Sequence, residues 1–322
     1  MRKLLKNLNK YTIALSALSA AALTNADILT SVRPLGFIAS SIADGITETQ
    51  VLIPAGASPH DYSMKPSDAK RVRDAEFVLW IGKDIDAFLE KSIAQRDATS
   101  VLTISKLAGI ESLLGETSAH DHDHDHDHDH DHDHDHDHDH DHDHHHSTNE
   151  LEQDWHVWFS PKISEQVAEQ LAQQLTQLYP QHQAKIAANL ETFKQQLAAT
   201  NQQITQQLAE FKDQGFYVFH DAYRYFENAY GLQQTGYFTI NPLIAPGAKK
   251  LAKIKEEINE HKVKCLFAEP QFTPKVLQTL QQSTNVKIGQ LDPMGEKIAL
   301  GTGSYSAFLQ QIAEDFSDCL KN

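Results

Sequence analysis

The sequence lacks the short motifs that build many metal and catalytic centres. It has two cysteines, Cys265 and Cys319, and no CxxC spacing, so a cysteine-ligated metal is not expected. No HExxH occurs, and no general base or nucleophile stands beside a clear partner, which argues against a hydrolase. A basic stripe is also missing, since the lysines are scattered among acidic residues. Nucleic-acid binding is therefore not predicted.

Long apolar runs are absent as well. The run Tyr11 to Leu23 is too short to span a bilayer as a mature helix. A basic segment precedes it, and the small-residue pattern ending at Ala26 follows it. This order predicts a signal peptide over residues 1–26 with cleavage after Ala26, the alternative being an uncleaved anchor. No cysteine lies near residue 26, so a lipid anchor is not supported, and we expect an exported, soluble product.

The two cysteines form an even pair in a chain that we expect to be exported. Such a pair favours a disulfide, which would pin the last helix to a sheet strand, because Cys265 lies in the mostly apolar run Val263 to Ala268. Two buried free thiols are the alternative.

Histidine and aspartate, in contrast, are abundant in one tract. Between His120 and His146 the two residues alternate, and the tract holds fifteen of the twenty histidines. Imidazole and carboxylate groups suit borderline divalent metals, zinc above all. Because the tract has no apolar residue, we expect a disordered insert over residues 117–150 that binds metal weakly. Its histidines are His120, His122, His124, His126, His128, His130, His132, His134, His136, His138, His140, His142, His144, His145 and His146.

Outside the tract, short β-branched runs alternate with helical spacing. The formal net charge is −16, and it falls to about −4 without the tract aspartates, so most of the acidity is local. The alternation predicts an α/β fold of two Rossmann-like lobes, each a mainly parallel sheet flanked by helices. We expect the first lobe over residues 27–179 and the second over 213–322. The expected strands are 28–32, 49–53, 77–81, 101–104, 216–219, 263–268 and 286–291. The expected helices are 35–43, 67–74, 85–91, 161–178, 183–211, 222–229, 247–260, 274–283 and 304–319.

We expect one long helix in the segment between the two lobes, residues 180–212. Its apolar residues mostly recur at steps of three and four from Ile186 to Phe211. A helix of about 29 residues would span roughly 43 Å and could act as a rigid connection between the lobes. An ordinary long helix within a bundle is the alternative.

Five histidines lie outside the tract, and three of them have special positions. His60 follows an expected strand, His220 ends another, and His156 stands between two tryptophans. The carboxyl ends of strands in open α/β sheets define the ligand crevice, so residues at these ends can meet there. Three imidazoles with one carboxylate or water form a common zinc arrangement, although each could also be a hydrogen-bonded core histidine.

Two carboxylates have a similar placement, because Glu269 and Asp292 each follow an expected strand. The remaining histidines, His182 and His261, lie in polar surroundings and are interpreted as solvated surface residues.

Several segments resemble the metal-binding proteins of bacterial ABC importers, most closely the periplasmic zinc-binding members. The similar segments are Pro54 to Ser67, Asp154 to Pro161, Phe219 to Phe226, Phe267 to Phe272 and Leu291 to Gly295. The acidic His-rich insert is itself typical of that family, and the resemblance covers essentially the whole mature chain.

The resemblance implies that His60, His156 and His220 bind zinc. It makes Asp292 the fourth ligand, with water or Glu269 as alternatives. Some relatives carry glutamate just before the first histidine, but Pro59 removes that ligand here. The family's disulfide falls on Cys265 and Cys319, and its linking helix on 183–211.

The resemblance further implies a monomeric periplasmic protein, not an enzyme, that delivers Zn²⁺ to a membrane permease and its ATPase. Other periplasmic zinc-binding proteins are candidate partners. Two other functions stay open, namely a zinc-storage protein that works through its tract and a zinc hydrolase. From the ordinary pKa of histidine we expect zinc uptake to weaken as the pH falls through about 6.5.

Overall fold

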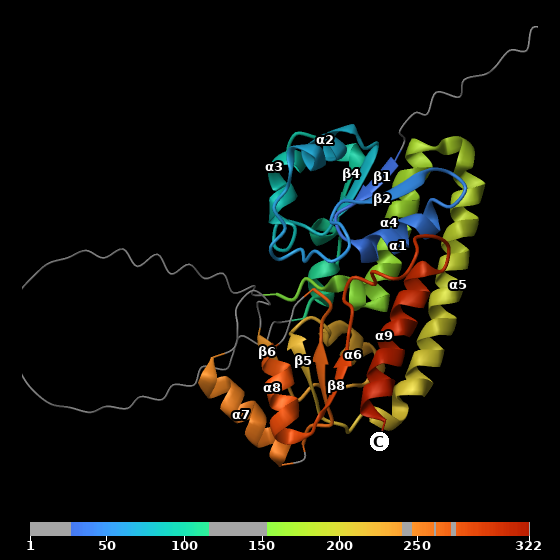
Figure 1. Cartoon of the computed structure of the whole chain (residues 1–322). Coiled ribbons are helices and arrows are strands. Elements are labelled where there is room, and N and C mark those ends of the chain that lie inside the picture. Colours follow the sequence, from blue (N-terminus) through green and yellow to red (C-terminus); the bar gives the residue numbers. More distant parts are fainter. Residues whose placement is uncertain (1–26, 116–152, 240–246, 261, 272–274, 322) are drawn as a thin grey trace, which may run out of the picture.

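The computed structural model describes residues 27–115, 153–239, 247–260, 262–271 and 275–321. Two sheets lie one above the other along a pair of long helices (Figure 1). The predicted signal peptide, the His/Asp tract and His261 lie outside the described residues. No helix among those described is both long and apolar enough to cross a membrane.

The first lobe is built on a parallel sheet with strand order β2-β1-β3-β4. The central strand β3 is buried at every position, as its run of Phe, Val, Leu and Trp predicts for a strand that is covered on both faces. Its elements are β1 (Asp27–Thr30), α1 (Arg33–Ile42), β2 (Glu48–Val51), α2 (Pro66–Asp74), β3 (Phe77–Trp80), α3 (Glu90–Ile93), β4 (Val101–Thr103) and α4 (Pro161–Leu178).

The second lobe repeats this arrangement with the order β6-β5-β7-β8, again all parallel. In each sheet the chain adds strands first on one side of the first central strand and then on the other side, so the strand order reverses between the two central strands. Ligands of open α/β sheets bind beyond the carboxyl ends of the strands at such a point. The elements are β5 (Phe216–His220), α6 (Arg224–Tyr230), β6 (Gly236–Thr239), α7 (Ala248–Asn259), β7 (Cys265–Ala268), α8 (Lys275–Thr284), β8 (Lys287–Gln290) and α9 (Ser304–Leu320).

Helix α5 (Gln183–Leu208) is the long connection that the periodicity predicts, and a short 3-10 turn extends it to Phe211. It runs beside α9, and α9 also contacts α1 of the first lobe (Figure 1). A single hydrophobic core joins the two lobes, from Phe37 through Phe159 to Phe316. The lobes are therefore fixed to one another by two helices and a shared core, which leaves little freedom for a wide hinge motion.

Two local differences separate the structure from the sequence-based elements. Strand β6 was not predicted, because its four residues follow a polar Gln-Gln-Thr segment, and it pairs only with β5 at the edge of the sheet. The helix expected over 85–91 is instead a 3-10 turn followed by the single turn α3.

The predicted disulfide is present between Cys265 of β7 and Cys319 of α9, with 5.9 Å between the two Cα atoms. It fastens the C-terminal helix to the second sheet. Since α9 also packs on α1 and α5, the bond adds to the connection between the lobes.

Candidate metal centre

His156 is held in place by the residue two positions before it. Asp154 Oδ1 accepts hydrogen bonds from the main-chain N–H of His156 at 2.9 Å and from its Nδ1 at 2.7 Å. The residue is 4% exposed, and Trp158 packs edge-on against the ring. Because Nδ1 donates to a carboxylate, the lone pair of Nε2 is free for a metal.

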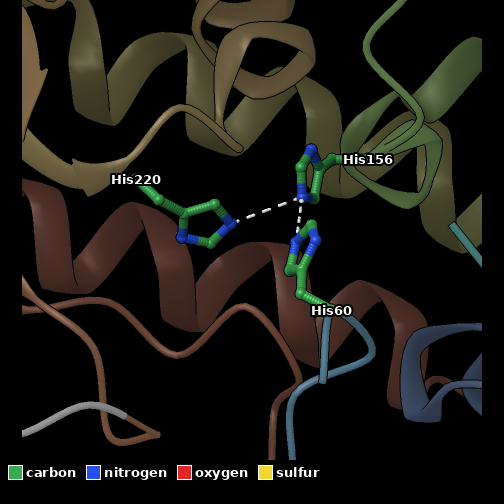
Figure 2. Close-up of side chains that lie close together, drawn as sticks. All are labelled: His60, His156 and His220. Carbon is green, nitrogen blue, oxygen red and sulfur yellow. Dashed lines mark hydrogen bonds between the residues drawn. The ribbon is translucent and has the colours of Figure 1, made fainter. Parts of the chain in front are cut away.

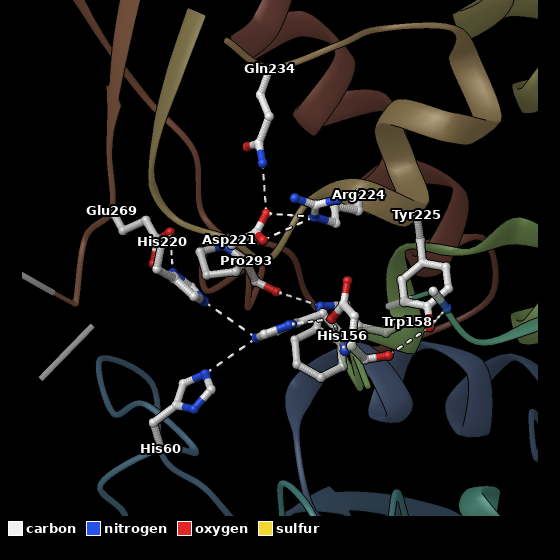
Figure 3. Close-up of polar contacts among 12 residues, drawn as sticks. His60, His156, Trp158, His220, Asp221, Arg224, Tyr225, Gln234, Glu269 and Pro293 are labelled. Carbon is white, nitrogen blue, oxygen red and sulfur yellow. Dashed lines mark hydrogen bonds and ion pairs between the residues drawn. The ribbon is translucent and has the colours of Figure 1, made fainter. Parts of the chain in front are cut away.

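His220 is oriented in the same way from the second lobe. It ends β5 and is 3% exposed, and its Nδ1 lies 2.6 Å from Oε1 of the buried Glu269. Tyr223 donates a hydrogen bond to the same oxygen at 3.2 Å. A second imidazole is thus fixed with its Nε2 turned toward the space between the lobes (Figure 3).

His60 lies on the loop between β2 and α2 and is partly exposed. Its Nδ1 makes no hydrogen bond to any residue that the structure describes, so no carboxylate orients its ring. Burial, and then the neighbouring His156 and His220, lower the pKa of His60 well below its ordinary value of 6.5. This imidazole is therefore neutral, the form that binds metal, at neutral pH.

The three rings converge on one point (Figure 2). Nε2 of His156 lies 3.2 Å from Nε2 of His60 and 3.3 Å from Nε2 of His220. Within the described part of the chain, this is the one group of three or more potential ligands whose atoms all lie within 4.8 Å of one another. Two imidazole nitrogens bound to one tetrahedral Zn²⁺ at about 2.0–2.1 Å lie roughly 3.3 Å apart, so the spacing fits zinc.

The charges around the cluster also fit a divalent cation. Asp154 and Glu269 are each 2% exposed, and each has one carboxylate oxygen without a hydrogen bond to the described residues. Together the two carboxylates carry a charge equal and opposite to that of Zn²⁺. Buried charges that are not compensated are costly, so a dication in the cluster would neutralise the pair.

Asp292 is placed differently from what the resemblance implies. Its Oδ1 accepts from the main-chain N–H of Met294 at 3.0 Å, and its Oδ2 accepts from that of Glu296 at 2.7 Å. Both oxygens serve the turn after β8, and Asp292 does not belong to the imidazole cluster. This arrangement does not support the expected role of Asp292 as fourth ligand. Glu269 contacts His220 at Nδ1 rather than on the side that faces the cluster.

The sequence-based interpretation missed the role of Asp154. The pattern Asp-x-His was its only signal, because a carboxylate two residues before a histidine can reach both the N–H and the ring. Glu269 was considered only as a ligand, whereas it orients one. His182 lies away from the cluster, at the start of α5.

The ends of the described chain on either side of the tract meet beside this centre. The main-chain N–H of Asp154 donates to the carbonyl of Gly115 at 3.0 Å. Tyr225 of α6 accepts from the N–H of Gly115 at 3.0 Å and donates to the carbonyl of Asp154 at 2.6 Å (Figure 3). The insert therefore leaves and rejoins the fold at one point, two residues from His156.

Comparisons with known proteins show which proteins this chain resembles. A 56% identical relative, covering 99% of both chains, is the high-affinity zinc uptake system protein ZnuA of Haemophilus influenzae. The protein of the same name from Yersinia pestis is 44% identical over 93% of this chain and 92% of its own. A crystal structure of ZnuA shares the fold, with a TM-score of 0.72 and 22% identity over 92% of this chain and 99% of its own.

The family described as zinc-uptake complex component A, periplasmic, matches residues 28–319. That range contains both sheets, the linking helix, all three converging histidines and the disulfide. The chain belongs to the family of periplasmic zinc-uptake component A proteins, which are transport components and not enzymes.

Proposed function

We propose that this protein captures periplasmic Zn²⁺ with His60, His156 and His220 and delivers it to the membrane permease and ATPase of a zinc ABC importer. The observation that carries the proposal is the convergence of three imidazoles, in which Nε2 of His156 lies from Nε2 of His60 and of His220 at the spacing of a zinc tetrahedron. The two buried carboxylates behind them support a dication as the cargo. Zinc is here the transported substrate, and water is the proposed fourth ligand.

The proposal also covers the mature N-terminus, the oligomeric state, the lobe boundaries, the tract and further partners. The mature chain begins after Ala26, acts as a monomer, and divides into lobes 27–179 and 213–322 with the linking segment 180–212. The tract histidines bind further zinc ions weakly and raise the local zinc concentration beside the centre. Other periplasmic zinc-binding proteins are proposed as additional partners.

The decisive experiment is a competition titration with a zinc chelator. His60→Ala, His156→Ala and His220→Ala should each lose the single tight site, while weaker binding by the tract remains. His182→Ala is the matched control, since it removes a histidine outside the cluster, and it should bind as tightly as the wild type. An unchanged tight site in all three cluster variants would refute the assignment.

Deletion of residues 120–146 separates this function from zinc storage. One tight zinc per molecule should remain after the deletion, whereas a storage protein would lose its high-affinity binding with the tract. Turnover of esters or peptides by the zinc-loaded protein would instead favour a zinc hydrolase.

A further inference from the structure

Three segments of the chain line the cavity of the metal centre, and hydrogen bonds to one carboxylate oxygen connect them. Glu296 Oε1 accepts a hydrogen bond from the main-chain N–H of Gly56 at 2.7 Å and one from Nε2 of Gln271 at 2.8 Å. Gly56 belongs to the loop that carries His60, Gln271 follows β7, and Glu296 follows β8. The residues of these segments that line the cavity are Ser58, Pro59, Gln271, Pro293 and Met294.

The turn after β8 is built to present Glu296 in this position. Asp292 accepts from the main-chain N–H of Met294 and of Glu296, which fixes the turn. Gly295 has a φ of +61°, and a Cβ there would lie 2.8 Å from a ring atom of Phe308, so the turn requires glycine at this point. The Asp292 carboxylate thus fixes the turn that carries Glu296.

His60 depends on its loop more than the other two histidines do. His156 and His220 are each anchored by a buried carboxylate at Nδ1, whereas His60 has no such partner among the described residues. Within that part of the chain, the bond from Gly56 to Glu296 is also the only hydrogen bond between residues 54–60 and the second lobe. Loss of this bond would leave the loop that carries His60 without a hydrogen bond to the second lobe.

The lobes themselves are held by α5, α9 and the shared core, so a bound ion must leave through movement of the segments that line the cavity. We propose that Glu296 is a positioning residue that latches the His60 loop over bound zinc and sets the rate at which the ion leaves. The inference rests on the proposed function. It adds a residue that touches neither the metal nor its ligands, with Asp292 and Gln271 as its supports.

The test measures zinc release from the full chain, loaded with one equivalent of Zn²⁺, into a large excess of a chromogenic chelator by stopped-flow. Glu296→Ala should release zinc about tenfold faster than the wild type, because a hydrogen bond to a charged acceptor is lost on each side of the latch. Glu296→Gln should release it at an intermediate rate, since the amide oxygen still accepts from Gly56. The association rate should stay unchanged in both variants.

Glu111→Ala is the matched control, because it removes an exposed carboxylate that has no side-chain partner among the described residues. It should release zinc at the wild-type rate. Equal acceleration by Glu296→Ala and Glu296→Gln would overturn the latch, since it would mean that negative charge alone retains the ion. Wild-type release from Glu296→Ala would also overturn it. A failure of the proposed function is seen separately, as tight binding that survives His220→Ala.

Discussion

Replacing Glu269 with glutamine should weaken zinc binding about 10- to 100-fold, without contact between the altered residue and the metal. The Nδ1 of His220 lies 2.6 Å from Glu269 Oε1, and the two residues are 3% and 2% exposed, so water does not weaken the bond. A hydrogen bond to a charged group contributes about 1.5–3 kcal/mol, and about 1.4 kcal/mol corresponds to a factor of ten in affinity. Glutamine keeps an acceptor oxygen and the ring orientation, and it loses only the charge.

Competition titration with a chelator at about pH 7.5 measures this effect. Glu227→Gln is a suitable control, because Glu227 is also buried in the second lobe and does not contact the cluster. Burial, and then the negative charge of Asp221, raise the pKa of Glu227 to about 8, so the amide replaces a largely protonated acid. The control should bind zinc as the wild type does. A Glu269→Gln protein with affinity within twofold of the wild type would refute the argument that this carboxylate strengthens His220 as a ligand.

Four further predictions concern pH and stability. Because the pKa of His60 is lowered by burial and then by its neighbouring imidazoles, protonation of His60 should weaken zinc binding only at a pH well below 6.5; zinc titrations between about pH 5 and 7.5 check this. Over the same range the unfolded chain takes up this proton more readily than the folded one, so the free energy of unfolding of the metal-free protein should decrease as the pH falls below about 6.5. Replacing Cys265 and Cys319 by alanine should lower that free energy by about 4 kcal/mol in denaturant titrations, because the loop between them is long. Asn189→Ala should lower it by about 1–3 kcal/mol, since the Asn189 amide donates to two main-chain carbonyls at the end of α1 and just beyond.

Much of the fold follows from short-range patterns in the sequence. Ser160 and Pro161 predict the start of α4, and the structure confirms it, with Ser160 Oγ accepting from the N–H of Ile163. Strands such as β3 and β5 were predictable because central parallel strands are apolar throughout. Strand β6 was not, because its four residues begin with a glycine and follow the polar Gln-Gln-Thr segment.

The metal centre was predictable to a similar degree and for a different reason. His60 follows a strand and His220 ends one, so the topology of parallel sheets indicated that they could meet. The supporting contacts could not be inferred in the same way. Whether the carboxylate of Asp292 faces a metal or its own turn depends on the main-chain conformation of residues 292–296. The spacing of apolar residues in the sequence does not predict that conformation. The connection between the lobes that α9 makes through its contacts with α1 and α5 likewise depends on tertiary packing, which the sequence pattern does not show.

The junction at Gly115, Asp154 and Tyr225 has a consequence for how this protein can vary. Because both ends of the insert are already bonded to each other, its closure is fixed by the folded body and not by its own length. Doubling a flexible loop adds only about 0.6 kcal/mol of closure entropy. The number of His-Asp repeats can therefore change with little effect on the free energy of folding.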